Sequence, residues 1–199
     1  MYVVIPYIKS KYDKIMRPIS EFFHLKLKLE PNHVSVIGFI IGLMSVGLIL
    51  LSYWQLGLIL MAISLFFDGI DGNIARVYEL ESETGEILEL IFDRSLEALL
   101  FLALASMFGI DYRLVFLVIY SILLMTSLRD KAKFDPGLKR ISLFLCLIMS
   151  FESIFTLVFF VHIVAFILQL CILDYKNQVS GEVQKNIAKQ EYRMCITNG

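Results

Sequence analysis

The stretch FFDGIDGNIARVYELESETGEILELIFDR, residues 66–94, decides the fold of this chain. Apolar runs flank it on both sides, and Asp68, Asp71 and Asp93 lie where those runs have not yet ended or have already resumed. Carboxylates inside apolar segments cost free energy unless something neutralises them, and in membrane segments they mark functional sites. The stretch is therefore predicted to form a turn between two apolar segments and to carry a functional site.

The composition indicates an integral membrane protein. Of the 199 residues, 58% are hydrophobic, and the mean hydropathy is +0.74, which exceeds what a soluble globular domain carries. The formal net charge is −1, and no nucleic-acid partner is expected. The three cysteines are too few and too scattered for a disulfide framework or a cysteine metal site.

Six apolar segments are candidates for crossing the bilayer, since a spanning helix needs about 20 apolar residues and fewer inside a bundle. They are residues 34–54, 56–75, 87–108, 114–128, 141–151 and 154–173. The fifth is short, and a weak turn at 150–153 leaves open a single bent or re-entrant unit for the last two. We therefore predict an all-α integral membrane fold with six transmembrane helices.

The distribution of Lys and Arg predicts the orientation. These residues concentrate in 1–33, in 129–140 and after 174, whereas the opposite connections contain only Arg113. Because short cytoplasmic loops carry an excess of basic residues, both termini and the turn within 66–94 are predicted to be cytoplasmic.

The remaining segments complete the predicted organisation. Residues 12–23 repeat apolar side chains at helical spacing, so an interfacial amphipathic helix, bent at Pro18, is expected before the first span. The predicted domains are a cytoplasmic and interfacial segment at 1–33, a six-helix transmembrane domain at 34–173, and a cytoplasmic tail at 174–199. The tail has no strong periodicity and is expected to be frayed or disordered.

Four carboxylates are predicted to converge at the turn. Asp68 and Asp71 are three residues apart and Glu89 and Asp93 four apart, so each pair shares one helix face. Counting outward from a turn near Leu80 places Asp68 opposite Asp93 and Asp71 opposite Glu89. Four neighbouring anions need cations, and Mg²⁺ or Mn²⁺ prefers oxygen ligands, so we predict a site for two such ions.

Small and basic neighbours extend this site. Gly72 and Ala75 clear one wall for a ligand, and Gly85 permits close approach. Arg76 offers a fixed positive fork that suits phosphate.

The full pattern resembles a known family signature. It reads Asp68-x2-Asp71-Gly72-x2-Ala75-Arg76-x8-Gly85-x3-Glu89-x3-Asp93. This resembles the signature of the CDP-alcohol phosphotransferase family, also called CDP-alcohol phosphatidyltransferases. Seven of the eight positions match with all spacings intact, and the departure is Glu89, where the family ordinarily has aspartate. The resemblance extends to Pro31-Asn32-x-x-Ser35 before the first span and covers roughly residues 17–173.

The resemblance implies a chemistry and a role for each matching residue. A CDP-activated donor gives its phosphoryl-linked group to an alcohol and releases CMP, as in phospholipid synthesis. Asp93 would be the catalytic base. The implied metal-binding residues are Asp68, Asp71, Glu89 and Asp93, and the implied CDP-binding residues are Asp68, Gly72, Ala75, Arg76 and Gly85.

The resemblance favours CDP-diacylglycerol as the donor and leaves the acceptor alcohol open. The basic residues Lys133, Lys139 and Arg140 face the same predicted side as the carboxylates. They either set the topology or bind the phosphate of an acceptor such as inositol phosphate or glycerophosphate.

Other functions remain compatible with the sequence. A small cation or proton transporter also places carboxylates in membrane spans, and Glu89 alone is compatible with an inactive membrane scaffold, but neither explains Arg76 and the glycines. Gly38, Gly42 and Gly47 indicate close helix packing and are compatible with a homodimer seam. His162 is expected to be a packed polar residue.

Overall fold

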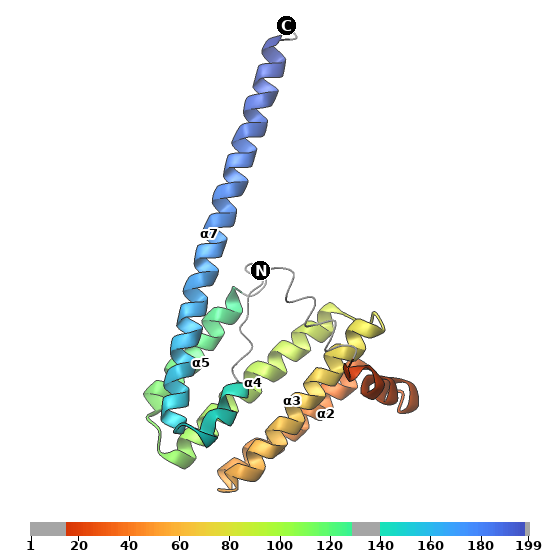
Figure 1. The fold of residues 1–199 in the computed structure, drawn as a ribbon, viewed down its shortest axis with the longest axis vertical. Coiled ribbons are helices and arrows are strands. Elements are labelled where there is room, and N and C mark those ends of the chain that lie inside the picture. The colour runs from red at the N-terminus through yellow and green to blue at the C-terminus, as the bar shows by residue number, and fades with distance from the viewer. Residues whose placement is uncertain (1–14, 129–139, 198–199) are drawn as a thin grey trace. The chain divides into compact units, whose positions relative to one another are not determined.

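In this computed structural model the described residues are 15–128 and 140–197, and they contain helices and no strands (Figure 1). The elements are η1 (Phe22–Lys26), α2 (Pro31–Leu50), α3 (Trp54–Val77), α4 (Glu83–Phe108), α5 (Tyr112–Ser127), η2 (Ile141–Leu147) and α7 (Phe151–Thr197). The chain divides into two compact units, Met1–Tyr112 and Arg113–Gly199. All the candidate residues between 68 and 93 belong to the first unit.

In the first unit, α2 packs against both α3 and α4, and the three helices run side by side (Figure 1). Glycines permit the close contacts. A Cβ on Gly38 would lie 3.1 Å from the Phe67 Cβ, and one on Gly42 would lie 2.6 Å from the Leu96 Cδ1. The predicted close packing is therefore confirmed for Gly38 and Gly42, whereas a Cβ on Gly47 would have no neighbour within 4 Å among the described residues of this chain.

Two buried hydroxyls join α2 to α3. Ser45 Oγ donates to the Gly57 carbonyl over 2.7 Å, and Ser64 Oγ donates to the Gly38 carbonyl over 2.8 Å. Small residues and serines at a helix interface are typical of helices that pack inside a membrane, where few other forces draw helices together.

The helical hairpin predicted for residues 66–94 is confirmed. Helix α3 ends at Val77 and α4 begins at Glu83. Ser82 caps α4, because its Oγ accepts a 3.1 Å hydrogen bond from the Gly85 backbone N–H. At the far end of the hairpin, Trp54 contacts Phe108 edge-to-face with 5.7 Å between ring centroids, and α4 ends at Gly109 in the left-handed region at φ 67°. The turn and this ring contact therefore link the two arms at the two ends of the hairpin.

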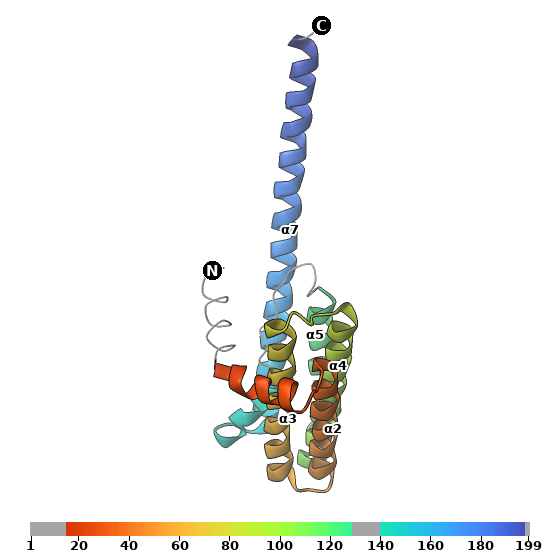
Figure 2. The same ribbon diagram turned by 90° about the vertical axis from the view of Figure 1, so that its right-hand side faces the viewer.

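The N-terminal segment packs on α2 and α3. Residues 15–21 are α-helical and continue into the π-helix η1. Met16 shares a buried cluster with Val34, Ile70 and Ile74, and Figure 2 shows the segment lying across these helices. Exposed apolar side chains remain on it, among them Ile15, Phe22, Leu25 and Leu27. Its placement in the membrane interface stays a prediction.

Among the described residues, three helical segments are long and apolar enough to span a membrane: α2, α3 and Phe151–Gln178 of α7, with mean hydropathies of 2.3, 1.6 and 2.6. Helix α5 is apolar but shorter, and α4 carries several charged residues along its length. The structure thus supports an all-helical membrane protein and does not confirm six spans. The fifth predicted span, 141–151, is instead the 3-10 helix η2 of seven residues, and at about 2.0 Å per residue it is too short to cross.

In the second unit, α7 packs against η2. His162 of α7 is 1% exposed, and its Nδ1 lies 2.6 Å from the Val158 carbonyl oxygen, so the prediction of a packed polar residue is confirmed. The prediction of a disordered tail is wrong, because α7 continues to Thr197. Extending an existing helix needs no new nucleation, and the Glu, Lys, Gln and Ala of the tail favour it.

Candidate functional site

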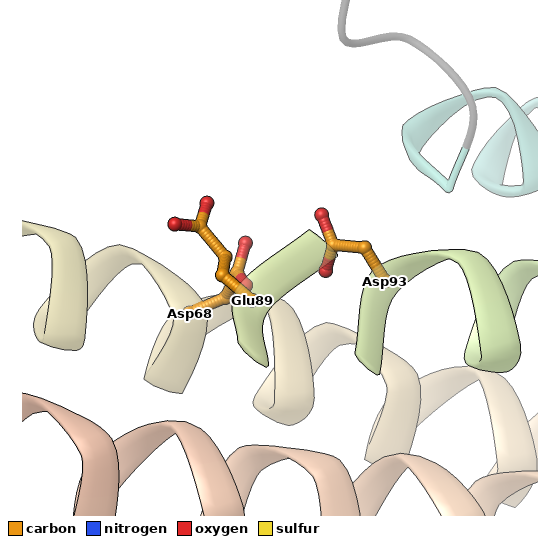
Figure 3. Close-up of side chains that lie close together, drawn as sticks. All are labelled: Asp68, Glu89 and Asp93. Atoms are coloured by element: carbon orange, nitrogen blue, oxygen red, sulfur yellow. The ribbon is translucent and has the colours of Figure 1, made fainter. Parts of the chain in front are cut away.

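Three carboxylates meet between α3 and α4. Asp68 of α3 and Glu89 and Asp93 of α4 each offer an oxygen, and these oxygens all lie within 4.8 Å of one another. Figure 3 shows the three side chains directed to the same side of the two helices. The predicted convergence is therefore confirmed for these three residues, and the extra methylene of Glu89 does not keep it out of the cluster.

Asp71 departs from the predicted arrangement. It was expected opposite Glu89 within one cluster, but its carboxylate is turned toward α2, where Ser35 Oγ donates to Asp71 Oδ2 over 2.5 Å. Residues three apart on a helix are separated by about 60° around its axis, so Asp68 and Asp71 face different neighbours. Asp71 is 5% exposed and still interacts electrostatically with Asp68 and Glu89.

Sequence reasoning missed the contact between Ser35 and Asp71. The two residues are 36 positions apart, and Ser35 was noted only as part of the Pro-Asn-x-x-Ser pattern. The Ser35 hydroxyl also lies 3.1 Å from the Pro31 carbonyl oxygen. Because a hydroxyl has one proton, it donates to one of these acceptors at a time, and the shorter contact is the one to Asp71 Oδ2.

A pocket opens beside the carboxylates, lined by the start of α2, the end of α3 and the start of α4. Its lining residues are Pro31, Asn32, Ser35, Asp71, Gly72, Ala75, Arg76, Leu80, Glu81, Ser82, Gly85, Glu86 and Glu89. The four neighbours singled out in the sequence, Gly72, Ala75, Arg76 and Gly85, all line it. Glu89 belongs both to the pocket lining and to the group of three carboxylates, and Asp71 lines the pocket as well.

The two pocket glycines have identifiable steric roles. A Cβ on Gly72 would lie 3.1 Å from Arg76 Nη1, so the guanidinium lies against the helix surface at Gly72. A Cβ on Gly85 would lie 3.0 Å from Ser82 Oγ and 3.3 Å from Asn32 Oδ1. Gly85 therefore lets the first turns of α2 and α4 approach each other at the pocket rim.

The described structure does not test the predicted acceptor-binding residues. Lys133 and Lys139 lie outside the described residues. Arg140 belongs to the second unit and is 6% exposed. Their role stays a prediction.

Comparisons with known proteins identify the family and its relatives. A family model described as CDP-alcohol phosphatidyltransferase matches residues 28–174. An uncharacterized protein of Aquifex aeolicus (strain VF5) is 34% identical over 106 residues, which cover 53% of this chain and 51% of that protein. The archaetidylinositol phosphate synthase of Pyrococcus horikoshii is 25% identical over 128 residues, which cover 64% of this chain and 65% of that protein. The chain thus spans between half and two thirds of these relatives.

A solved structure shares the fold. The crystal structure of Mycobacterium tuberculosis phosphatidylinositol phosphate synthase with CDP-DAG bound superposes with a TM-score of 0.65. The sequence identity is 14%, and the match covers 80% of this chain and 94% of the mycobacterial chain. At this identity the similarity establishes the fold alone.

Proposed function

The chain belongs to the CDP-alcohol phosphatidyltransferase family, and we propose that it transfers a phosphatidyl or related phospho-alcohol group from a CDP-activated lipid to a polar alcohol, releasing CMP. The observation that carries the proposal is the set of three carboxylates, with oxygens within 4.8 Å of one another, beside the pocket that the signature residues line. A transporter would need polar groups along a path across the bilayer, whereas these carboxylates gather near the turn of one hairpin.

The carboxylates fit a divalent cation site. They supply only oxygen ligands, which Mg²⁺ and Mn²⁺ prefer, and three of them offer oxygens within 4.8 Å of one another. Asp68, Glu89 and Asp93 would hold Mg²⁺ or Mn²⁺, and Asp71 would join them from the pocket side, a set large enough for two ions. When bound, such ions would polarise the diphosphate of the donor and stabilise charge developing on it.

The pocket residues would bind the donor, which we propose to be CDP-diacylglycerol. Arg76 presents a planar, permanently charged group for phosphate oxygens. Gly72, Ala75 and Gly85 leave room for the nucleotide against the helix backbones. The CDP-DAG in the mycobacterial structure supports this choice of donor, because that protein has the same fold.

Asp93 would act as the base. It accepts the proton of the acceptor hydroxyl, whose oxygen forms a bond to the phosphorus that carries the lipid. The bond from that phosphorus to the CMP oxygen breaks, and CMP leaves with the electron pair. The position of Asp93 in the group of three carboxylates supports this role, because the proposed cation site lies beside it.

We propose a phosphorylated acceptor, inositol phosphate or glycerophosphate, bound on the cytoplasmic side of the membrane. The name of the Pyrococcus relative supports a phosphorylated inositol, and the basic residues between 129 and 140 supply charge for its phosphate. Lys133, Lys139 and Arg140 are the proposed contacts.

The test is CMP release by the purified protein with CDP-diacylglycerol and a panel of acceptors: inositol phosphate, glycerophosphate, inositol, glycerol and serine. We expect release only with a divalent cation and fastest with a phosphorylated acceptor. Lys139→Ala should then raise the apparent KM for that acceptor more than for a neutral one. Equal changes in the apparent KM for charged and neutral acceptors would indicate that Lys139 serves only to set the membrane topology. Absence of CMP release with every acceptor would contradict the proposed activity.

A further inference from the structure

A largely buried ion pair follows Asp93 on α4. Arg94 Nη1 is 2.9 Å from Glu97 Oε2, and the Arg94 and Glu97 side chains are 14% and 4% exposed. The other guanidinium nitrogen, Nη2, lies 3.9 Å from Asp93 Oδ2. Neither residue belongs to the signature. The Arg94 guanidinium therefore lies near both Asp93 and Glu97, and it is closer to Glu97.

An arginine in this position competes with a divalent cation for Asp93. Its guanidinium stays charged under all physiological conditions, and its planar fork matches a carboxylate with two parallel hydrogen bonds. With water largely excluded, such a pair is much stronger than at the surface. A full Arg94–Asp93 pair would occupy the oxygens that the proposed cation site and proton transfer need.

Glu97 lies one turn further along the helix. It is three residues beyond Arg94 and four beyond Asp93, the two spacings at which side chains on a helix are neighbours. By binding Nη1 at 2.9 Å it holds the guanidinium at the longer distance from Asp93.

We propose that Glu97 is a positioning residue that holds the Arg94 guanidinium away from Asp93 and so keeps the carboxylate group open to divalent cations. The inference rests on the proposed function, since it takes Asp93 as a member of the cation site. It assigns a role in cation affinity to two residues outside the family signature.

The test is the binding of Mn²⁺ to the purified full-length chain without substrates, measured as free Mn²⁺ by electron paramagnetic resonance. Glu97→Gln removes the negative charge that holds Arg94, and moving one positive charge onto Asp93 should weaken Mn²⁺ binding on the order of tenfold. The double variant Arg94→Gln/Glu97→Gln removes the competing cation as well, so its dissociation constant should return to within about threefold of the wild-type value.

Glu21→Gln is the matched control. Arg17 and Glu21 form an ion pair of the same 2.9 Å length, but their side chains are 63% and 42% exposed and lie on the N-terminal segment. This variant should bind Mn²⁺ as the wild type does. Thermal unfolding of each variant shows whether it is folded, and if Glu97→Gln is not, the single variant Arg94→Gln decides, because it should bind Mn²⁺ at least as tightly as the wild type.

The outcomes separate the two claims. The positioning role would be overturned if Glu97→Gln bound Mn²⁺ with the same dissociation constant as the wild type. It would also be overturned if the double variant bound Mn²⁺ as weakly as Glu97→Gln does. Either result would leave the cation site intact. Weakened binding in a folded Arg94→Gln would also overturn it. Absence of Mn²⁺ binding by the wild type would overturn the cation site itself.

Discussion

The hydrogen bond from Ser35 to Asp71 gives the sharpest single-residue test of the site. Ser35→Ala removes the hydroxyl that donates to Asp71 Oδ2 over 2.5 Å and leaves a carboxylate that is 5% exposed without this donor. Hydrogen bonds to charged groups contribute about 1.5–3 kcal/mol, which corresponds to roughly a 10- to 150-fold change in an equilibrium constant. We therefore expect the concentration of Mg²⁺ for half-maximal CMP release to rise within this range, because Asp71 is no longer held in one orientation.

Two variants isolate the effect. Ser35→Thr keeps the hydroxyl and should stay within about threefold of the wild type, since the donor is retained. Ser45→Ala removes a buried 2.7 Å hydrogen bond from the same helix to the Gly57 carbonyl. It should lower the free energy of unfolding by about 1–3 kcal/mol without changing the Mg²⁺ requirement. If Ser35→Ala and Ser45→Ala needed the same Mg²⁺ concentration for half-maximal CMP release, the proposed role of the Ser35 hydroxyl in orienting Asp71 would be refuted.

Three further outcomes are expected. Asp93→Asn should lower turnover by a factor on the order of 10² or more while CDP-diacylglycerol still binds, and turnover near wild type would move the base elsewhere. Excess EDTA, and separately Asp68→Asn, should abolish CMP release without unfolding the protein, whereas full turnover in EDTA would remove the cation assignment. Gly42→Ala should destabilise the protein by about 1–3 kcal/mol in thermal unfolding through overpacking. Gly47→Ala, where a Cβ meets nothing within 4 Å, is its control, and equal destabilisation by both would contradict the packing described for α2.

The hairpin and its carboxylates were predictable because their geometry is local. Asp68, Glu89 and Asp93 lie within one turn-linked pair of helices, so helical rise and a short turn fix which residues share a level. The neighbours of the Asp71 carboxylate were not predicted correctly, because they depend on which helix covers that face of α3. The covering helix is α2, and its Ser35 contact joins positions far apart in the chain.

The spans were predicted from hydropathy, which does not distinguish a spanning helix from a short apolar segment packed on a neighbour. Residues 141–151 are apolar enough for either, and the structure shows a seven-residue 3-10 helix. The ion pair of Arg94 and Glu97 could have been predicted from the sequence. Two opposite charges three residues apart in an apolar helix are expected to bind each other. That signal was overlooked because the signature ends at Asp93.

The most direct test of the central claim is the anomalous scattering of Mn²⁺ in crystals of the protein grown with CDP-diacylglycerol. We predict a Mn²⁺ peak at about 2.0–2.3 Å from carboxylate oxygens of Asp68, Glu89 and Asp93, with the donor diphosphate beside it in the pocket. A diphosphate bound in the pocket without a Mn²⁺ peak at these carboxylates, or a Mn²⁺ peak elsewhere, would contradict the account.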